Sequence, residues 1–409
     1  MKQKKILILS PLSIFPKIMA SQERTYRIAE RLSKDHIVDI AAIIRNENEL
    51  KESNEKLKSV CNKFYPVHAV NPSNNNFKRK LYGIKFLISN KLKKIPEDYF
   101  YSTQKPYIKF LADIIAANKY DVVHAEYWFM AEVFRHIDPY TFKVIDTVDV
   151  LFDKKRQSFE NHFGKNIPAS KQKELQKYKS MELENLELAD LLISISEVDN
   201  DVFKEYKITG KKIVIPIGQP VDYFSDYTKS DDGKTILFYG SMGGHENIDA
   251  FFRFWNEIYP AVKEKVPDVK INIVGANPPD SIKVLTKNKN VSVTGFVQDV
   301  RPHLAKSSLL MVPLNVAAGF RGRVVDVMAM SIPVVGTPKA LNCVGISNGV
   351  EGFISDSNKD LAHNTVQLLT DSSMRTKMGN AALQFVKDHL SVEATYGKLS
   401  EYYGNIEIK

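Results

Sequence analysis

Residues 309–338 read LLMVPLNVAAGFRGRVVDVMAMSIPVVGTP, and this stretch decides the fold. An apolar run at 309–314 leads into the loop NVAAGF, and a helix is expected to start near Gly319–Arg323. A second apolar run, IPVVGT at 332–337, follows the helix. Nearly continuous apolar character is typical of strands that are covered on both faces of a parallel sheet. The stretch therefore predicts a β-α-β unit of an α/β fold.

Similar apolar runs recur on both sides of this unit, and helical patterns separate many of them. In the second half they lie at 235–240, 270–275, 291–296 and 352–357, and in the first half at 5–10, 36–43, 64–70, 120–126, 142–149, 191–196 and 212–218. A polar, turn-rich stretch at 215–234 divides the series in two. We therefore predict two Rossmann-like domains, each built on a parallel sheet.

Helical spacing is clearest in two segments. The first is 21–34, for which Ser21 is the expected N-cap. The second is 247–260, where six apolar residues fall on one helical face. They are Ile248, Phe251, Phe252, Trp255, Ile258 and Tyr259. We expect these aromatic side chains to belong to the core and not to a ligand cage.

The composition bounds the class of protein. The chain has 409 residues, of which 44% are hydrophobic and 26% charged, so it has ample material for a core, and disorder and fibres are excluded. The formal net charge of +9 suits an anionic partner. The two cysteines, Cys61 and Cys343, allow no disulfide framework and favour a reducing compartment.

The N-terminus MKQKKILILSPLSIFPKIMA resembles a signal peptide, but Pro11 and Pro16 interrupt its apolar stretch. We interpret residues 5–10 instead as a buried first strand. No apolar run reaches the roughly 18 residues that a membrane-spanning helix needs. The longest candidate, 309–320, contains Asn315.

The loop after 309–314 is expected to carry chemistry, because open α/β sheets bind ligands beyond the carboxyl ends of their strands. Gly319 and Gly322 let the backbone approach a ligand, and free N–H groups at a helix start favour an anion. Arg321 and Arg323 add fork-shaped donors that suit a diphosphate. The alternative is that both arginines pair with acids of the neighbouring domain. Asp326 either accepts from sugar hydroxyls or pairs with Arg323 one turn away.

Two further loops follow predicted strands. In YGSMGGHEN at 239–247, three glycines permit a tight turn before a helix. In GFVQD at 295–299, the backbone is expected to contact the edge of a nucleobase. Each signal is weak alone.

Taken in order, these segments resemble the nucleotide-sugar domain of GT-B glycosyltransferases, specifically the retaining family 4 group. The segments are FYGSMGGHENIDAF, VKINIVGANPP, VSVTGFVQDVRPHLAKSSLLMVPL and GFRGRVVDVMAMSIPVVGTPKAL. The first half resembles the matching acceptor domain through KILILSP, YDVVHAE, VIDTVDV, ELENLELADLLISISEVDNDVF and IVIPIGQPVDYF. The resemblance implies an acceptor domain at 1–217, a donor domain at 218–390 facing it across a cleft, and a helix in 391–409 that crosses back to the first domain.

The resemblance also implies roles for individual residues. The donor diphosphate is expected at Gly319, Phe320, Arg321, Gly322, Arg323 and Val324; the ribose or sugar at Asp326, Gly240 and Ser241; and the nucleobase at Gly275, Phe296 and Val297. The first glutamate of the family's E-x7-E pair is replaced by Ala318, and Ser241 and Asn247 stand where the family often has a basic pair. We expect Arg321 and Arg323 to compensate. No metal or other cofactor is implied.

In the first domain, Glu126 stands where the family commonly has an active-site His, and Val148-Asp149 replaces a later His-Asp. Glu126 and Asp149 follow strands, so a carboxylate there would orient an acceptor hydroxyl or accept its proton. The alternative is that each caps a loop. His124 is expected to point into the fold. Arg24, in the loop after the first strand, either reaches a phosphate or acceptor or lies on a surface helix face.

Residues 77–95, FKRKLYGIKFLISNKLKKI, read as a basic amphipathic helix. Such helices often lie on anionic lipid, and lipid-linked saccharides are frequent acceptors in the family. The alternative is a helix packed on the first sheet. The location expected is cytoplasmic, with peripheral binding to the inner face of the plasma membrane.

The expected function is transfer of a hexose-type sugar from a nucleotide-diphospho-sugar to a saccharide or lipid-linked acceptor, with retention, in bacterial surface polysaccharide or glycoconjugate synthesis. Two alternatives stay open: a GT-B sugar-nucleotide epimerase, and a catalytically inactive protein that binds nucleotide-sugars, for which Ala318 and Val148 argue. A nucleic-acid partner is not expected, because no motif for one is present.

Overall fold

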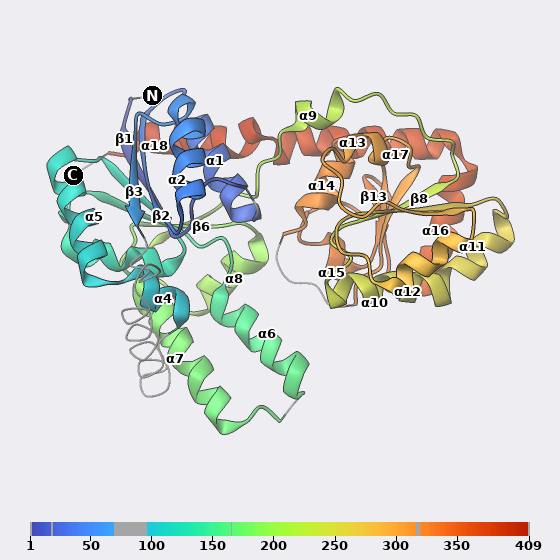
Figure 1. Cartoon of the computed structure of the whole chain (residues 1–409), viewed down its shortest axis with the longest axis horizontal. Helices are drawn as coiled ribbons and strands as arrows, with labels where there is room; N and C mark the ends of the chain where they lie inside the picture. The colour runs from blue at the N-terminus through green and yellow to red at the C-terminus, as the bar shows by residue number, and fades with distance from the viewer. Residues whose placement is uncertain (1, 18, 69–95, 165, 316–319, 408–409) are drawn as a thin grey trace. The chain divides into compact units, whose positions relative to one another are not determined.

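The computed structural model describes residues 2–17, 19–68, 96–164, 166–315 and 320–407. The chain forms two compact units (Figure 1). Unit 1 comprises residues 1–216 and 395–409, and unit 2 comprises residues 217–394. The segment 391–394 thus belongs to unit 2, although we expected it in the returning C-terminal stretch. The cleft expected between the domains stays a prediction.

Unit 1 is built on a seven-stranded sheet in the order β3-β2-β1-β4-β5-β6-β7, and all of its neighbouring strands run parallel. The strands are β1 Lys5–Ser10, β2 Ile37–Ile44, β3 Lys63–His68, β4 Val122–Glu126, β5 Phe142–Asp146, β6 Leu191–Ser194 and β7 Lys211–Val214. Strand β4 is buried along its whole length and β1 is nearly so, as their apolar sequences predict. The N-terminal apolar run is therefore a central strand.

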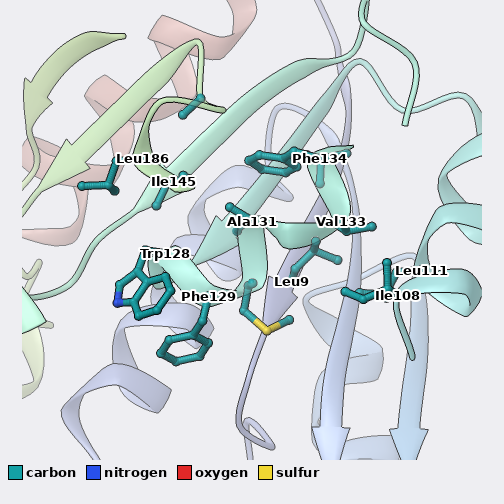
Figure 2. Close-up of a cluster of buried hydrophobic side chains, with 14 of the residues drawn as sticks. Leu9, Ile108, Leu111, Trp128, Phe129, Ala131, Val133, Phe134, Ile145 and Leu186 are labelled. Carbon is teal, nitrogen blue, oxygen red and sulfur yellow. The ribbon is translucent and has the colours of Figure 1, made fainter. Parts of the chain in front are cut away.

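Helices and two 3-10 segments connect these strands in the described residues. They are α1 Ala20–Leu32, α2 Glu47–Lys56, the 3-10 segment Leu57–Ser59, α4 Glu97–Ser102, α5 Lys105–Asn118, the 3-10 segment Trp128–His136, α6 Leu151–Phe163, α7 Ala169–Leu186 and α8 Glu197–Glu205. Helix α18 Lys398–Asn405 completes the unit at the end of the chain. Figure 2 shows the core where Trp128, Phe129 and Phe134 of the 3-10 segment lie near Leu9 of β1 and Ile145 of β5. Helices α6 and α7 pack together as a hairpin that extends from the unit (Figure 1).

The C-terminal segment is integral to unit 1. Tyr396 and Tyr403 are completely buried, and the hydroxyl of Tyr403 lies 2.7 Å from Nδ1 of His124 on β4. The backbone carbonyl of Ser400 lies 2.9 Å from Nε2 of His36. His124 therefore points into the fold, as we expected.

Unit 2 repeats the architecture with a six-stranded parallel sheet in the order β10-β9-β8-β11-β12-β13. Its strands are β8 Thr235–Tyr239, β9 Lys270–Val274, β10 Val291–Val293, β11 Leu309–Val312, β12 Val334–Gly336 and β13 Gly352–Ile354. Its helices are α9 Val221–Ser225, α10 His245–Arg253, α11 Tyr259–Lys265, α12 Asp280–Lys283, α13 Arg301–Leu304, α14 Gly322–Met328, α15 Pro338–Leu341, α16 Asn358–Thr370 and α17 Ser372–Phe385.

The aromatic face at 247–260 lies in the core of unit 2, as predicted. Phe251 and Ile258 are completely buried, and Phe252 and Trp255 pack against the same cluster. One detail differs from expectation: a π-helical segment, Phe254–Ile258, joins α10 to α11.

Three other expectations have outcomes here. The N-cap of α1 is Met19 and not Ser21, because the side-chain oxygen of Gln22 accepts the Met19 N–H at 2.8 Å and the helix already begins at Ala20. The basic segment 77–95 lies outside the described residues. Within the described ranges, no helix combines the length and the apolar character that crossing a bilayer requires.

Candidate functional site

The sheet topology marks one edge of unit 2. Strand β8 pairs with β9 on one side and with β11 on the other, so the strand order reverses between β8 and β11. In doubly wound folds, ligands bind at the carboxyl ends of the strands at such a reversal. The first candidates for a site are therefore two short segments: the loop directly after β8 and the residues directly before α14.

Arg321 is the N-cap residue of α14, and its side chain is largely buried. The Nε and Nη2 atoms of its guanidinium are shielded from solvent, and neither has a hydrogen-bond partner among the residues that the structure describes. The nearby acid is Glu246 of α10, whose Oε2 lies 3.8 Å from Nη2, which is beyond hydrogen-bonding distance. Buried N–H groups without partners are costly, so this arginine is ready to receive an anion.

Arg323 lies on the first turn of α14 and is exposed. Its guanidinium lies 5.5 Å from the centre of the Tyr239 ring, within the range of a cation–π contact. The Tyr239 hydroxyl points to Oδ2 of Asp326 at 3.5 Å. Burial, and next the charge of Asp326, raises the pKa of Tyr239. Tyr239 is thus placed between the cation and the carboxylate that we assigned to the donor, a position that we did not predict from the sequence.

Gly240 follows β8 with φ at 157° and lies at the centre of this group. A Cβ atom there would come within 3.2 Å of Nη1 of Arg323 and 3.4 Å of Nδ2 of Asn247. Asn247 donates to the carbonyl of Ser241 at 2.8 Å and so holds the turn before α10. The structure therefore brings Gly240, Ser241, Arg321, Arg323 and Asp326 to one edge of unit 2.

The residues expected at the nucleobase lie beyond neighbouring strands. Gly275 follows β9, and a Cβ atom on it would lie 1.8 Å from the carbonyl oxygen of Gly240. Glycine at this position therefore lets the backbone at residue 275 pass close to the backbone at residue 240. Phe296 follows β10 and is 81% exposed, which leaves its ring free to stack on a base. Val297 packs against the core cluster of unit 2.

Of the remaining residues predicted to hold the diphosphate, Phe320 and Gly322 are half-buried and Val324 is buried in the core. Gly319 and Ala318 lie outside the described residues. The binding roles assigned to this group stay predictions.

At the carboxyl edge of unit 1, Glu126 is the last residue of β4 and is buried. Burial raises its pKa to about 8, and hydrogen bonds with the hydroxyls of Thr25 and Ser10 partly oppose the shift. Such a carboxyl group holds a proton at neutral pH more firmly than an exposed one does. It is held inside the fold instead of projecting freely from a loop.

Asp149 lies after β5, is half-buried, and its Oδ2 forms an ion pair with Lys154 at 2.8 Å. The preceding residue, Val148, has φ at 56°. Tyr127, directly after Glu126, has φ at 61°. A positive φ is strained for bulky and β-branched residues, and such strain often clusters at functional sites. The sequence contains no signal for these dihedral angles.

The expectation for Arg24 is wrong in both of its forms. Arg24 lies on α1 and is completely buried, so it neither reaches an acceptor nor lies on a surface face. Its guanidinium pairs with Asp146 at 2.8 Å and donates to the carbonyls of Ile215 and Pro216, each at 3.0 Å. These long-range contacts satisfy the charge inside unit 1.

Comparisons with known proteins agree with this architecture. Residues 233–371 match the family Glycosyl transferases group 1. No curated protein matches the chain in sequence.

Among solved structures, sucrose-phosphate synthase from Thermosynechococcus elongatus is similar with a TM-score of 0.65 at 14% identity, over 98% of each chain. A glycosyltransferase from Rickettsia africae has a TM-score of 0.65 at 17% identity, again over 98% of each chain. HepE from Anabaena, in complex with UDP and glucose, has a TM-score of 0.63 at 14% identity, over 99% of this chain and all of that chain. The chain therefore has the GT-B fold, and the part of it that matches a glycosyltransferase family is residues 233–371.

Proposed function

We propose that the protein transfers a hexose-type sugar, with retention, from a nucleotide-diphospho-sugar to a hydroxyl of a saccharide or lipid-linked acceptor. The observation that carries the proposal is the guanidinium of Arg321, which has two buried N–H-bearing atoms without partners among the described residues. It lies at the edge of unit 2 where doubly wound sheets bind ligands.

The donor half of the reaction rests on charge. As the bond between the anomeric carbon and the diphosphate oxygen breaks, negative charge builds up on the diphosphate. Arg321 and Arg323 are placed to stabilise that charge, and Arg321 does so from a site that is shielded from water. The leaving phosphate oxygen takes the proton of the attacking hydroxyl, so this step requires no strong base from the protein.

The acceptor half rests on Glu126 and Asp149. We assign to them the orientation of the acceptor hydroxyl at the carboxyl edge of unit 1, where Glu126 ends β4 and Asp149 follows β5. Asp149 is the more accessible of the two, because Glu126 is almost completely buried.

The biological setting follows from the family. We assign the protein to synthesis of bacterial surface polysaccharides or glycoconjugates, in the cytoplasm and at the anionic inner face of the plasma membrane, with 77–95 as the membrane contact. We expect no metal. The UDP and glucose bound to HepE support a nucleotide-sugar donor.

Donor hydrolysis tests the proposal without knowledge of the acceptor. We would incubate the protein with UDP-glucose, GDP-mannose and ADP-glucose in turn and measure the nucleoside diphosphate released. Slow release from one donor, abolished in Arg321→Ala and kept in Arg156→Ala, is the expected result. Arg156 is a matched control because it lies on an exposed part of α6 in unit 1. Binding of a donor without any release would favour an inactive binding protein.

A further inference from the structure

Glu246 is a carboxylate that the assigned site does not yet use. It lies in the first turn of α10, and its side chain is 50% exposed. Among the described residues, its charged neighbour is Arg321, with Oε2 and Nη2 3.8 Å apart. The two groups are close enough to interact electrostatically but too far apart to form a hydrogen bond.

The backbone beside Glu246 is held by a side-chain hydrogen bond of its neighbour. The next residue, Asn247, donates from Nδ2 to the carbonyl of Ser241 at 2.8 Å, which ties the start of α10 to the loop after β8. A Cβ atom at Gly240 would lie 3.2 Å from Nη1 of Arg323 and 3.4 Å from Nδ2 of Asn247, so a side chain there would crowd both groups. The carboxylate is therefore presented by a built turn.

This pair requires a ligand with two kinds of polar group. Arg321 offers donors at Nε and Nη2, and Glu246 offers acceptors about 4 Å away. A phosphoryl group satisfies Arg321 but is repelled by Glu246. A terminal phosphoryl group that carries a sugar ring satisfies both, because the ring hydroxyls donate to the carboxylate while the phosphoryl oxygens accept from the guanidinium. The terminal phosphoryl group of a free nucleoside diphosphate carries no such ring.

We infer that Glu246 is a specificity-determining residue for the donor, which accepts a hydrogen bond from a hydroxyl of the sugar joined to the diphosphate. The inference rests on the proposed function and deepens it. It also gives the site a carboxylate in a chain that has Ala at position 318. Glu246 selects the sugar-linked form over the free nucleoside diphosphate, and Arg321 binds both.

The test compares two ligands in one variant. Calorimetry would measure the affinity of UDP against UDP-glucose, GDP against GDP-mannose, and ADP against ADP-glucose. In Glu246→Gln, the preference for the sugar-linked form over its diphosphate should fall about 10-fold, because the charged acceptor of the hydrogen bond is replaced by a neutral amide oxygen. The affinity for the free diphosphate should stay or rise, since a like charge is removed.

Asp249→Asn is the matched control. Asp249 lies on the same helix, is 58% exposed and pairs with His245 at 2.9 Å, so its loss removes one negative charge without touching Arg321. Its preference should equal that of the wild type. An unchanged preference in Glu246→Gln, or equal changes in both variants, overturns the inference while diphosphate binding still supports the proposed function. Failure of the wild type to bind any nucleoside diphosphate overturns the proposed function itself, and the inference with it.

Discussion

The guanidinium of Arg24 lies 2.8 Å from the carboxylate of Asp146, and both side chains are completely shielded from solvent. Burial alone would raise the pKa of Asp146, but the charges and hydrogen bonds of Arg24 and His124 together outweigh burial and lower that pKa. Removal of one partner of such a pair leaves an uncompensated buried charge. Arg24→Met should therefore destabilise unit 1 by about 3–5 kcal/mol.

Urea unfolding followed by tryptophan fluorescence measures this loss. The chain has two tryptophans, Trp128 in unit 1 and Trp255 in unit 2, so a Trp255→Phe background reports unit 1 alone. Arg27→Met is the control on the same helix, where partly exposed pairs with Glu23 and Glu30 predict a loss below about 1 kcal/mol. Equal losses in both variants would contradict the account of the buried pair.

Stability should fall as pH rises through neutrality, because two buried carboxyl groups keep their protons in the folded state. Burial raises the pKa of Glu126 and of Glu182 from 4.5 to about 8. Between these values the folded chain holds protons that the unfolded chain has lost, so their contribution is complete below about pH 4.5 and lost above about pH 8.

Glu126→Gln keeps a neutral side chain at every pH, so the decline in urea midpoint from pH 5 to pH 8 should be shallower than in the wild type. Glu182 should leave a residual slope in the variant. An identical slope in both proteins would show that Glu126 is already ionised in the folded state.

The strands were predictable because a parallel sheet buried on both faces requires apolar runs. All the predicted runs contain strands, and the structure ends several of them early for local reasons. The run 291–296 ends at Val293, and Gly295 then turns the chain with φ at 69°. The run 332–337 begins as a strand only at Val334, after Pro333, which has no N–H to donate to a ladder.

The site was predictable only in part. The Gly-Phe-Arg-Gly-Arg segment indicates an anion site from local chemistry alone. The contact between Arg321 and Glu246 was not predictable, because it joins the starts of two helices far apart in the sequence. Arg24 was misplaced for the same reason: its partners, Asp146 and Ile215, lie far along the chain.

Gly275→Ala should disrupt the edge of unit 2. The added Cβ atom would lie 1.8 Å from the carbonyl oxygen of Gly240, and φ at 148° disfavours any side chain. We expect a loss of about 2–5 kcal/mol in calorimetric unfolding, together with weaker binding of nucleoside diphosphates.

Gly349→Ala is the matched control, because Gly349 also has a positive φ, 82°, but a Cβ atom there meets nothing within 4 Å. Only the dihedral strain remains, so about 1 kcal/mol should be lost. If the two alanine variants melt alike, close approach is not the reason for glycine at 275.

Asp149→Asn and Glu126→Gln test the acceptor side. Each should lower turnover about 10-fold or more in an assay with a working acceptor, while donor affinity stays unchanged. Lys154→Ala removes the ion-pair partner of Asp149 but keeps its carboxylate, so turnover should fall less than in Asp149→Asn. Full turnover in both carboxylate variants would remove the proposed roles.

The central claim is that Arg321 and Arg323 bind the two linked phosphoryl groups of a nucleotide. Calorimetric titration of the wild type, Arg321→Ala, Arg323→Ala and Arg156→Ala with UDP, GDP and ADP tests it most directly. The account predicts that the wild type and Arg156→Ala bind one of these ligands equally, and that Arg321→Ala weakens that binding about 10-fold or more, with a measurable loss in Arg323→Ala. An unchanged affinity in Arg321→Ala would contradict it.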